Sequence, residues 1–310
     1  MKGRVIKSTG SWYAVKSIED DVIHQCRIVG KFRIKGLKVT NPVAVGDLVE
    51  VNTDGSIVEI YDRDNYVVRQ SPRKRHQLHL IASNVDQAVV VVTIIEPNLK
   101  QGFIDRFLLM TEPYDIPVHI VFNKADLYQE KELAVYNFLK DIYTGIGYMV
   151  SLVSAEQDIG IKELRESLRD KISLVSGQSG VGKSTLVNVI QSGLGLKTTE
   201  LSDYSGKGQH TTTFAEMFDL TIGGSIIDTP GIKALSFNHF EVMDVAHNFK
   251  EFFTLSDNCK FGDCTHRDEP KCAIKNGIDD GLISELRYLN YLQLVEEVED
   301  QNYWERNVEY

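Results

Sequence analysis

The chain has 310 residues, of which 42% are hydrophobic and 25% charged, and its formal net charge is −10. This length allows two or three domains that each bury a core, and the composition is typical of a soluble globular protein. No apolar run reaches the ~18 residues that a membrane span needs, and residues 1–15 lack the apolar segment of a signal peptide. We therefore expect a cytoplasmic protein with no membrane partner.

The acidic total conceals an uneven distribution of charge. Residues 1–40 contain nine Lys or Arg against three acids, whereas residues 291–310 contain six acids and one Arg. A local basic field can bind phosphates while an acidic tail sets the net charge. A solvated surface of mixed charge explains the same pattern, so composition leaves nucleic-acid binding open.

Residues 1–70 read as short β-segments separated by turn signals such as Asn41-Pro42 and Asp54-Gly55. The segments are GRVIKST, SWYAVKS, HQCRIV, GDLVEVN and GSIVEIYD. Several short strands in one small region predict an all-β barrel of the OB type. An SH3-like barrel has a similar sequence pattern and remains an alternative.

Residues 71–236 change to long apolar runs that alternate with helical stretches. The runs are DQAVVVVTII, PVHIVFNKAD, YMVSLVSA and KISLVSG. Buried β-rich runs between helices predict a parallel, doubly wound α/β domain. From residue 237 to residue 310 the pattern becomes mainly helical and includes a cysteine-rich stretch, which predicts a third, small domain.

The segment GQSGVGKST matches the phosphate-loop pattern G-x-x-x-x-G-K-[ST] and lies between a predicted strand and a predicted helix. Its glycines let backbone N–H groups turn onto a β-phosphate, and the helix N-terminus adds positive charge. Lys183 is expected to bridge the β- and γ-phosphates and Ser184 to ligate Mg²⁺. The alternative is a chance match in a glycine-rich turn, but such a turn need not lie between a strand and a helix. The predicted nucleotide-binding residues are Gly177, Gln178, Ser179, Gly180, Val181, Gly182, Lys183, Ser184 and Thr185.

The choice of base comes from the N-K-x-D segment Asn123, Lys124, Ala125 and Asp126 at the end of a predicted strand. The Asp126 carboxylate can accept from N1–H and the 2-amino group of guanine, which adenine lacks. Asn123 would fix the loop, and the stem of Lys124 would pack along the ring. Ser154 and Ala155, after the next strand, supply the backbone that reads guanine O6. GTP or GDP is therefore the predicted ligand.

The segment Asp228-Thr229-Pro230-Gly231 follows the apolar run SII. Asp228 is placed to hold Mg²⁺ through water, and the Gly231 N–H to contact the γ-phosphate. A threonine of the upstream segment GKGQHTTT is expected to complete the Mg²⁺ shell. Spacing favours Thr212, and Thr211 and Thr213 remain alternatives.

The residue after this segment is Ile232, where many GTPases carry a glutamine that orients the attacking water. An isoleucine cannot bind that water, so intrinsic hydrolysis is expected to be slow. His210 is the nearest internal residue that can orient the water or accept its proton. An exposed loop role for His210, an RNA contact, or water positioning by a partner are the alternatives.

These motifs occur in a permuted order. Ordinary small G domains run phosphate loop, switch threonine, DxxG, NKxD and SA, whereas here NKAD and SA come first. The same sheet can form because termini in such folds lie at the surface. In this order the DTPG segment leads directly into the C-terminal domain. A change in that segment that depends on the γ-phosphate could therefore be transmitted to the C-terminal domain.

Cys259, Cys264, His266 and Cys272 lie within fourteen residues. Three thiolates and one imidazole form the ligand set of a closed, tetrahedral zinc site. The residues between them are polar, so a metal would stabilise what packing cannot. We predict one structural Zn²⁺; buried free cysteines are the alternative.

Two basic groups are candidates for RNA contact. Arg33, Lys35 and Lys38 follow Phe32 in the barrel, and Arg73, Lys74 and Arg75 precede the α/β domain. Lysine and arginine meet phosphates, and an aromatic ring can stack a base. Each group also fits an ordinary solvated surface.

The permuted order NKAD, GQSGVGKST, HTTT and DTPG, with a β-barrel before it and a Cys/His cluster after it, resembles the small-ribosomal-subunit-dependent GTPases of the RsgA family. The resemblance covers essentially the whole chain. It implies an OB-fold domain, a zinc-binding domain and a role in late maturation of the small ribosomal subunit and its rRNA. It also implies that the subunit stimulates GTP hydrolysis.

Two other functions fit part of the sequence. One is a non-enzymatic GTP- or GDP-sensing RNA-binding module, in which Ile232 would mean that hydrolysis is incidental. A phosphate-loop ATPase or kinase is disfavoured by the NKAD segment together with Ser154 and Ala155. Nothing in the sequence resembles a dimer seam, so we expect a monomer.

Overall fold

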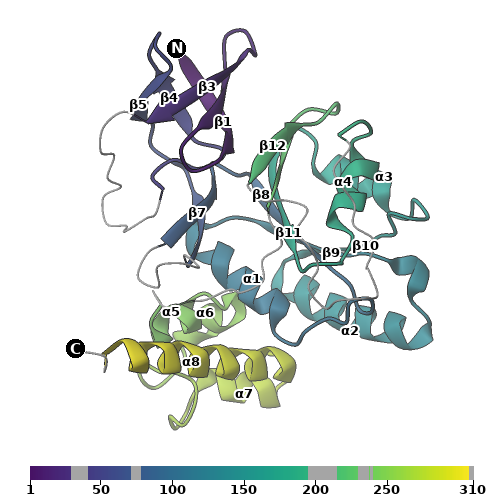
Figure 1. Ribbon diagram of the computed structural model, residues 1–310. Coiled ribbons are helices and arrows are strands. Elements are labelled where there is room, and N and C mark those ends of the chain that lie inside the picture. Colours follow the sequence, from purple (N-terminus) through teal and green to yellow (C-terminus); the bar gives the residue numbers. More distant parts are fainter. Residues whose placement is uncertain (29–40, 71–77, 195–214, 230–236, 238–239, 307–310) are drawn as a thin grey trace.

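A computed structural model describes residues 1–28, 41–70, 78–194, 215–229, 237 and 240–306, without the side chains of 69–70 and 301–306. Figure 1 shows a barrel at the upper left, an α/β part at the right and a helical part at the lower left. Within this described part of the chain, no helix has both the length and the apolarity needed to cross a membrane.

Five strands form the N-terminal barrel. Strand β1 pairs with β2 and also with β4, so the order β1-β2-β3-β5-β4 closes on itself. Along β1 the buried Gly3 and Val5 alternate with less buried residues, and apolar residues of the five strands fill the barrel interior. The all-β barrel predicted from the sequence is confirmed. Its strands are β1 (Lys2–Ser8), β2 (Tyr13–Ser17), β3 (Ile23–Ile28), β4 (Leu48–Val51) and β5 (Ser56–Ile60).

A second run of strands forms the sheet of the α/β part, in the order β10-β9-β8-β11-β13-β12. All neighbours are parallel except β12, which is antiparallel to β13. Strand β12 also pairs with β1 at Lys7 and Glu216, so the sheet continues into the barrel. The strands are β8 (Gln87–Val92), β9 (Val118–Phe122), β10 (Met149–Leu152), β11 (Ile172–Gly177), β12 (Glu216–Asp219) and β13 (Ser225–Asp228).

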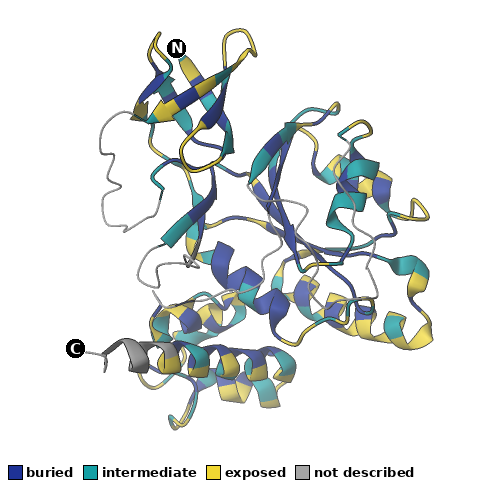
Figure 2. Cartoon of the chain, viewed as in Figure 1, coloured by how far each residue is buried: buried dark blue, intermediate teal, exposed yellow. Residues whose placement is uncertain are grey.

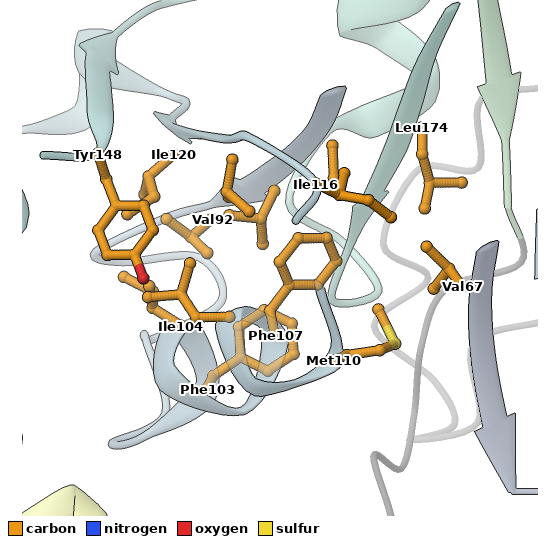
Figure 3. Packing of buried hydrophobic residues seen from close by; sticks show 14 of the residues in the cluster. Val67, Val92, Phe103, Ile104, Phe107, Met110, Ile116, Ile120, Tyr148 and Leu174 are labelled. Carbon is orange, nitrogen blue, oxygen red and sulfur yellow. The ribbon is translucent and has the colours of Figure 1, made fainter. Parts of the chain in front are cut away.

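Helices cover both faces of this sheet, as expected for a doubly wound fold. Helices α1 (Phe103–Thr111) and α2 (Glu130–Ile146) pack on one face, and α3 (Ile161–Ser167) and α4 (Lys183–Ile190) on the other. Figure 3 shows the first interface, where Phe103 and Phe107 of α1 meet Val92 and Ile120 of the sheet. The central strands β8 and β9 are accordingly buried along their whole length (Figure 2). Short 3-10 helices span Glu112–Tyr114 and Ala125–Leu127.

Local sequence explains where α2 begins and ends. Gln129 and Glu132 form a capping box at its N-terminus. Gly147 follows the last turn with φ +103°, a conformation that favours glycine, and ends the helix. Outward-facing positions of α2 are exposed in Figure 2, while Tyr136, Leu139 and Tyr143 face the core.

A hairpin of β6 (Tyr66–Gln70) and β7 (Leu78–Ser83) connects the barrel to the α/β part. Its residue Val67 is fully buried in the same core as α1, as Figure 3 shows. The hairpin therefore packs with the α/β part although it follows the barrel directly in sequence.

The C-terminal part consists of α5 (Val242–His247), α6 (Lys250–Ser256), α7 (Ala273–Asp279) and α8 (Glu285–Arg306). Arg287 of α8 is 1% exposed and joins it to the α/β part. Its guanidinium pairs with Asp105 of α1 at 2.6 Å and with Glu251 of α6 at 2.8 Å. The guanidinium carbon also lies 4.1 Å from the centre of the Phe249 ring. This buried network fixes the helical part against α1, below the sheet in Figure 1. The mainly helical C-terminal part predicted from the sequence is confirmed.

Candidate functional site

The glycine-rich loop between β11 and α4 has a backbone that requires glycine. Gly180 and Gly182 have φ angles of +85° and +84°, which other residues rarely adopt. A Cβ atom on Gly177 would lie 2.2 Å from the carbonyl oxygen of Val91, and one on Gly182 would lie 2.6 Å from Nδ2 of Asn123. The loop thus approaches two neighbouring segments closely before it enters α4.

Lys183 is the first residue of α4, and its ammonium group bends back over the loop. It donates to the carbonyl oxygens of Gly177 at 3.2 Å and Gln178 at 3.1 Å. Burial lowers the pKa of Lys183, and the negative charge of Asp228 opposes that shift. Asp228 ends β13, beside Val175 of β11, and is 2% exposed. A cation and a carboxylate therefore lie at the carboxyl ends of adjacent parallel strands, where α/β sheets bind ligands.

Asn123 joins the three sequence segments of the predicted base-reading site. Its Nδ2 donates to the carbonyl oxygen of Val181 in the glycine-rich loop at 2.9 Å. Its Oδ1 accepts from the backbone N–H of Ala155 at 3.2 Å. The Ser154 hydroxyl donates to the carboxylate of Asp126. Segments separated by 58 and 32 positions are thereby brought into direct contact.

Lys124 lies in the same loop, with a φ angle of +64°. Its ammonium group donates to the carbonyl oxygen of Glu96, in the connection between β8 and α1. Ala125 donates its backbone N–H to Val153 at 3.0 Å. The loop after β9 is therefore attached to its neighbours on both sides.

Tyr128 contacts the base-reading loop, although it belongs to none of the motifs. Its buried hydroxyl donates to the carbonyl oxygen of Asn123 at 2.9 Å and accepts from the backbone N–H of Ile94 at 2.8 Å. Burial raises the pKa of Tyr128 to about 12, so the phenol stays protonated and can donate. Only its position two residues after Asp126 hinted at this role. The sequence does not show which backbone groups a tyrosine reaches.

The remaining predicted residues divide into two groups. Gln178, Ser184 and Thr185 are half-buried around the glycine-rich loop, and Ser179 is exposed. The other residues, predicted for the threonine and DTPG segments and for rRNA contact, lie outside the described residues. These are Phe32, Arg33, Lys35, Lys38, Arg73, Lys74, Arg75, His210, Thr211, Thr212, Thr213, Gly231 and Ile232.

The four Cys and His residues of the C-terminal part converge on one point. The three Sγ atoms and a ring nitrogen of His266 all lie within 4.8 Å of one another. Nδ1 of His266 is 3.7 Å from Sγ of Cys259 and 3.4 Å from Sγ of Cys272. Cys264, His266 and Cys272 are buried, and Cys259 is partly buried. Separations of this size fit four ligands around a single tetrahedral Zn²⁺, whose bonds to sulfur are about 2.3 Å long.

Hydrogen bonds from α8 hold the chain that carries these ligands. The hydroxyl of Tyr288 donates to the carbonyl oxygen of His266 at 2.8 Å, and that of Tyr291 donates to Thr265 at 2.7 Å. Burial of Glu269 opposes its ionisation, but bonds from Thr265 and Arg267 prevail and lower its pKa to about 2. The ligand loop is thus shaped by local bonds and by α8. A site with four protein ligands is closed and structural.

Comparisons with known proteins agree with this arrangement. The family model of the RsgA N-terminal domain matches residues 2–57, and that of the RsgA GTPase matches residues 60–238. The small ribosomal subunit biogenesis GTPase RsgA of Phocaeicola vulgatus is 49% identical over 307 residues, covering 98% of this chain and 99% of that one. The protein of that name from Flavobacterium psychrophilum is 48% identical, with coverages of 96% and 93%.

Two solved structures are similar over nearly the whole chain. The crystal structure of YjeQ from Thermotoga maritima has a TM-score of 0.77 and 36% identity, covering 96% of this chain and 98% of that one. The crystal structure of YloQ, a circularly permuted GTPase, has a TM-score of 0.73 and 30% identity, with coverages of 100% and 96%. The chain therefore belongs to the RsgA family of circularly permuted GTPases.

Proposed function

We propose that this protein hydrolyses GTP while bound to the small ribosomal subunit and acts in the late maturation of that subunit. The main observation in support is that Asn123 contacts both the glycine-rich loop and Ala155. A base-reading loop and a phosphate loop held together in this way can bind one guanine nucleotide. The small ribosomal subunit is proposed as the partner because the relatives are named small ribosomal subunit biogenesis GTPases.

The residues of the site have complementary roles in this proposal. Asp126 accepts from the guanine edge, and the backbone of Ala155 donates to O6. Lys183 and the backbone N–H groups of residues 177–185 hold the phosphates. Gly231 contacts the γ-phosphate.

A magnesium ion belongs to the same proposal. Mg²⁺, when bound, neutralises charge that develops on the β- and γ-phosphates. Ser184 and Thr212 would ligate it, and Asp228 would hold it through water. Hard oxygen ligands of this kind suit Mg²⁺. The electrostatic interaction between Asp228 and Lys183 supports this placement, because the lysine and the magnesium ion would bind the same phosphates.

Water activation is assigned to His210, which orients the attacking water when the upstream threonine loop is ordered by the γ-phosphate. The isoleucine at position 232 cannot do so. Hydrolysis by the free protein should therefore be slow and should rise when the subunit orders the site. A small-subunit-stimulated rate that survives in His210→Ala would assign this role to the subunit instead.

We further propose the domain limits 1–70, 71–236 and 237–310 and a monomer that acts in the cytoplasm. The first limit falls within the β6–β7 hairpin, whose Val67 packs with the α/β core. The basic residues of the barrel and of the following linker would contact rRNA phosphates. Zinc held by the four Cys and His ligands would stabilise the last domain.

Steady-state GTP hydrolysis with small subunits, with large subunits and without either tests the proposal. We expect strong stimulation by small subunits alone. Slow turnover with every subunit would refute it and leave a nucleotide-sensing RNA binder. Asp126→Asn tests base recognition separately: it should weaken GTP binding and favour xanthosine nucleotides, and retained GTP preference would contradict the assigned role.

A further inference from the structure

The turn between β2 and β3 carries a run of six exposed residues at the edge of the barrel. Three of them are apolar, and their exposed fractions are 54% for Ile18, 48% for Val22 and 55% for Ile23. Isolated exposed apolar residues are ordinary, whereas several in one short segment are a candidate interaction site. The other three residues are acidic: Glu19, Asp20 and Asp21. We call this segment, residues 18–23, the barrel tip.

Hydrogen bonds within the barrel tip hold it in one shape. The backbone N–H of Ser17 donates to Val22 at 2.9 Å and closes the turn. The carboxylate of Asp20 accepts from the N–H of Val22 at 3.2 Å, and the hydroxyl of Ser17 accepts from the N–H of Glu19 at 3.3 Å. A turn that is already ordered loses little conformational entropy when it binds a partner.

The cations beside the barrel tip do not offset its charge. The ammonium group of Lys16 pairs with Asp21 at 2.9 Å and with Asp219 at 2.8 Å. Lys2, whose carbonyl oxygen accepts from the N–H of Ile18, directs its ammonium group over the Tyr61 ring, 4.5 Å from the centroid. Among the described residues, the carboxylates of the barrel tip and of Asp219 outnumber the ammonium groups of Lys16 and Lys2, so the described surface here is negative.

We propose that the barrel tip docks on a basic protein surface that offers an apolar pocket, and not on RNA. This inference rests on the proposed function, because a small ribosomal subunit presents both RNA and protein. Phosphates would be repelled by the acidic residues, since RNA binding depends on neutralising backbone charge. A basic protein surface complements the acids, and a pocket in it buries Ile18, Val22 and Ile23. The partner is thus a basic protein of the subunit.

Charge reversal separates the two kinds of partner because their charges are opposite. Glu19→Lys/Asp21→Lys reverses two acids and keeps Asp20, which orders the turn. We expect its affinity for intact small subunits to fall on the order of tenfold, mainly through slower association. Its affinity for protein-free small-subunit rRNA should not fall. Asp279→Lys/Asp280→Lys changes two exposed acids at the C-terminal end of α7 by the same total charge and is the matched control.

Tighter binding of Glu19→Lys/Asp21→Lys to intact subunits would overturn the inference and indicate an RNA partner. Unchanged binding, or a loss equal to that of the control, would also overturn it. Ile18→Ser/Ile23→Ser tests the apolar contact and should weaken subunit binding while GTP hydrolysis by the free protein stays the same. If wild-type protein neither bound small subunits nor was stimulated by them, the proposed function itself would fail, which these variants do not decide.

Discussion

The nucleotide site and the Cys/His cluster differ in how far along the chain their parts come from. The nucleotide site joins Asn123 to Val181 and to Ala155, which are 58 and 32 positions away, and Tyr128 to Ile94. The cluster takes all four ligand atoms from residues 259–272. The predicted nucleotide site depends on a correctly folded sheet, whereas the cluster would depend on a metal, on local turns and on the bonds from α8.

This difference predicts that the nucleotide site and the Cys/His cluster lose their structure independently of each other. Long-range hydrogen bonds between backbone and side chains are lost when strands β8, β9 and β11 shift. A local ligand set is lost when the metal leaves. The network around Arg287 is one of several contacts between α8 and α1, together with the Arg106–Glu297 pair and the bond from Asn290 to Asp105, so these contacts determine how far a failure spreads.

Zinc removal should have the largest effect. Small zinc modules derive about 10–16 kcal/mol of apparent folding free energy from the metal, so a chelator or Cys272→Ser should abolish the packing of Tyr288 and Tyr291. Near-ultraviolet circular dichroism would detect that loss, and metal analysis should find one zinc per wild-type chain. Nucleotide affinity should persist. Cys26→Ser, in the barrel core, is the control that keeps the metal.

A parallel loss of nucleotide affinity on chelation would show that the regions are not independent. In that case the coupling would have to pass through α1, and the comparison above would need to be revised.

Arg287→Met breaks the junction between the two regions. It leaves Asp105 and Glu251 buried without their cation, and removing one partner of a buried pair costs about 3–5 kcal/mol. Urea unfolding should detect this loss of stability. Arg169→Met removes an exposed, solvent-screened pair with Glu166 and should leave the stability almost unchanged. Equal costs for the two variants would contradict the role of the network.

Acid should weaken the α/β part through His119. Its ring nitrogens face the hydroxyls of Ser151 at 2.8 Å and Ser167 at 3.3 Å, and burial, aided by the charge of Lys171, lowers its pKa to about 4. The unfolded chain takes up this proton first, near pH 6.5, so stability falls as pH drops from about 6.5 to about 4. The loss should approach about 3 kcal/mol.

This pH dependence is measured by urea unfolding of wild type and of His119→Gln, both without zinc so that thiolate protonation does not contribute. The stability difference between them should shrink between pH 7 and pH 4. A constant difference would show that His119 does not titrate on unfolding.

Tyr128→Phe should have the smallest effect, and it falls on the nucleotide site alone. Removing the hydroxyl leaves the N–H of Ile94 and the carbonyl of Asn123 without this partner, a cost of about 1–3 kcal/mol. Part of that cost should appear as weaker GTP binding, by roughly tenfold, and as poorer discrimination between GTP and ITP. Tyr136→Phe alters a ring that packs on Phe122 and is the control.

Unchanged discrimination in Tyr128→Phe, with only lower thermal stability, would make Tyr128 a structural residue without influence on base reading.

Much of the architecture could be predicted because its signals are local. Short β-segments between turn signals predicted the barrel strands, and long apolar runs between helical stretches predicted the parallel sheet. The domain limits remain predictions, and the β6–β7 hairpin shows why such limits are hard to predict. Val67 lies next to the barrel in sequence but packs with α1.

The sequence by itself determined the chemistry of the sites. The types and spacing of residues 123–126, 154–155, 177–185 and 259–272 together predict a guanine reader, a phosphate loop and a zinc ligand set, because this combination of patterns is specific. The tertiary structure alone decided which distant groups meet. The contacts of Tyr128 with Ile94, of Lys124 with Glu96 and of Arg287 with Asp105 depend on strand order and helix packing. No local pattern encodes them, because they arise only when the whole sheet has formed.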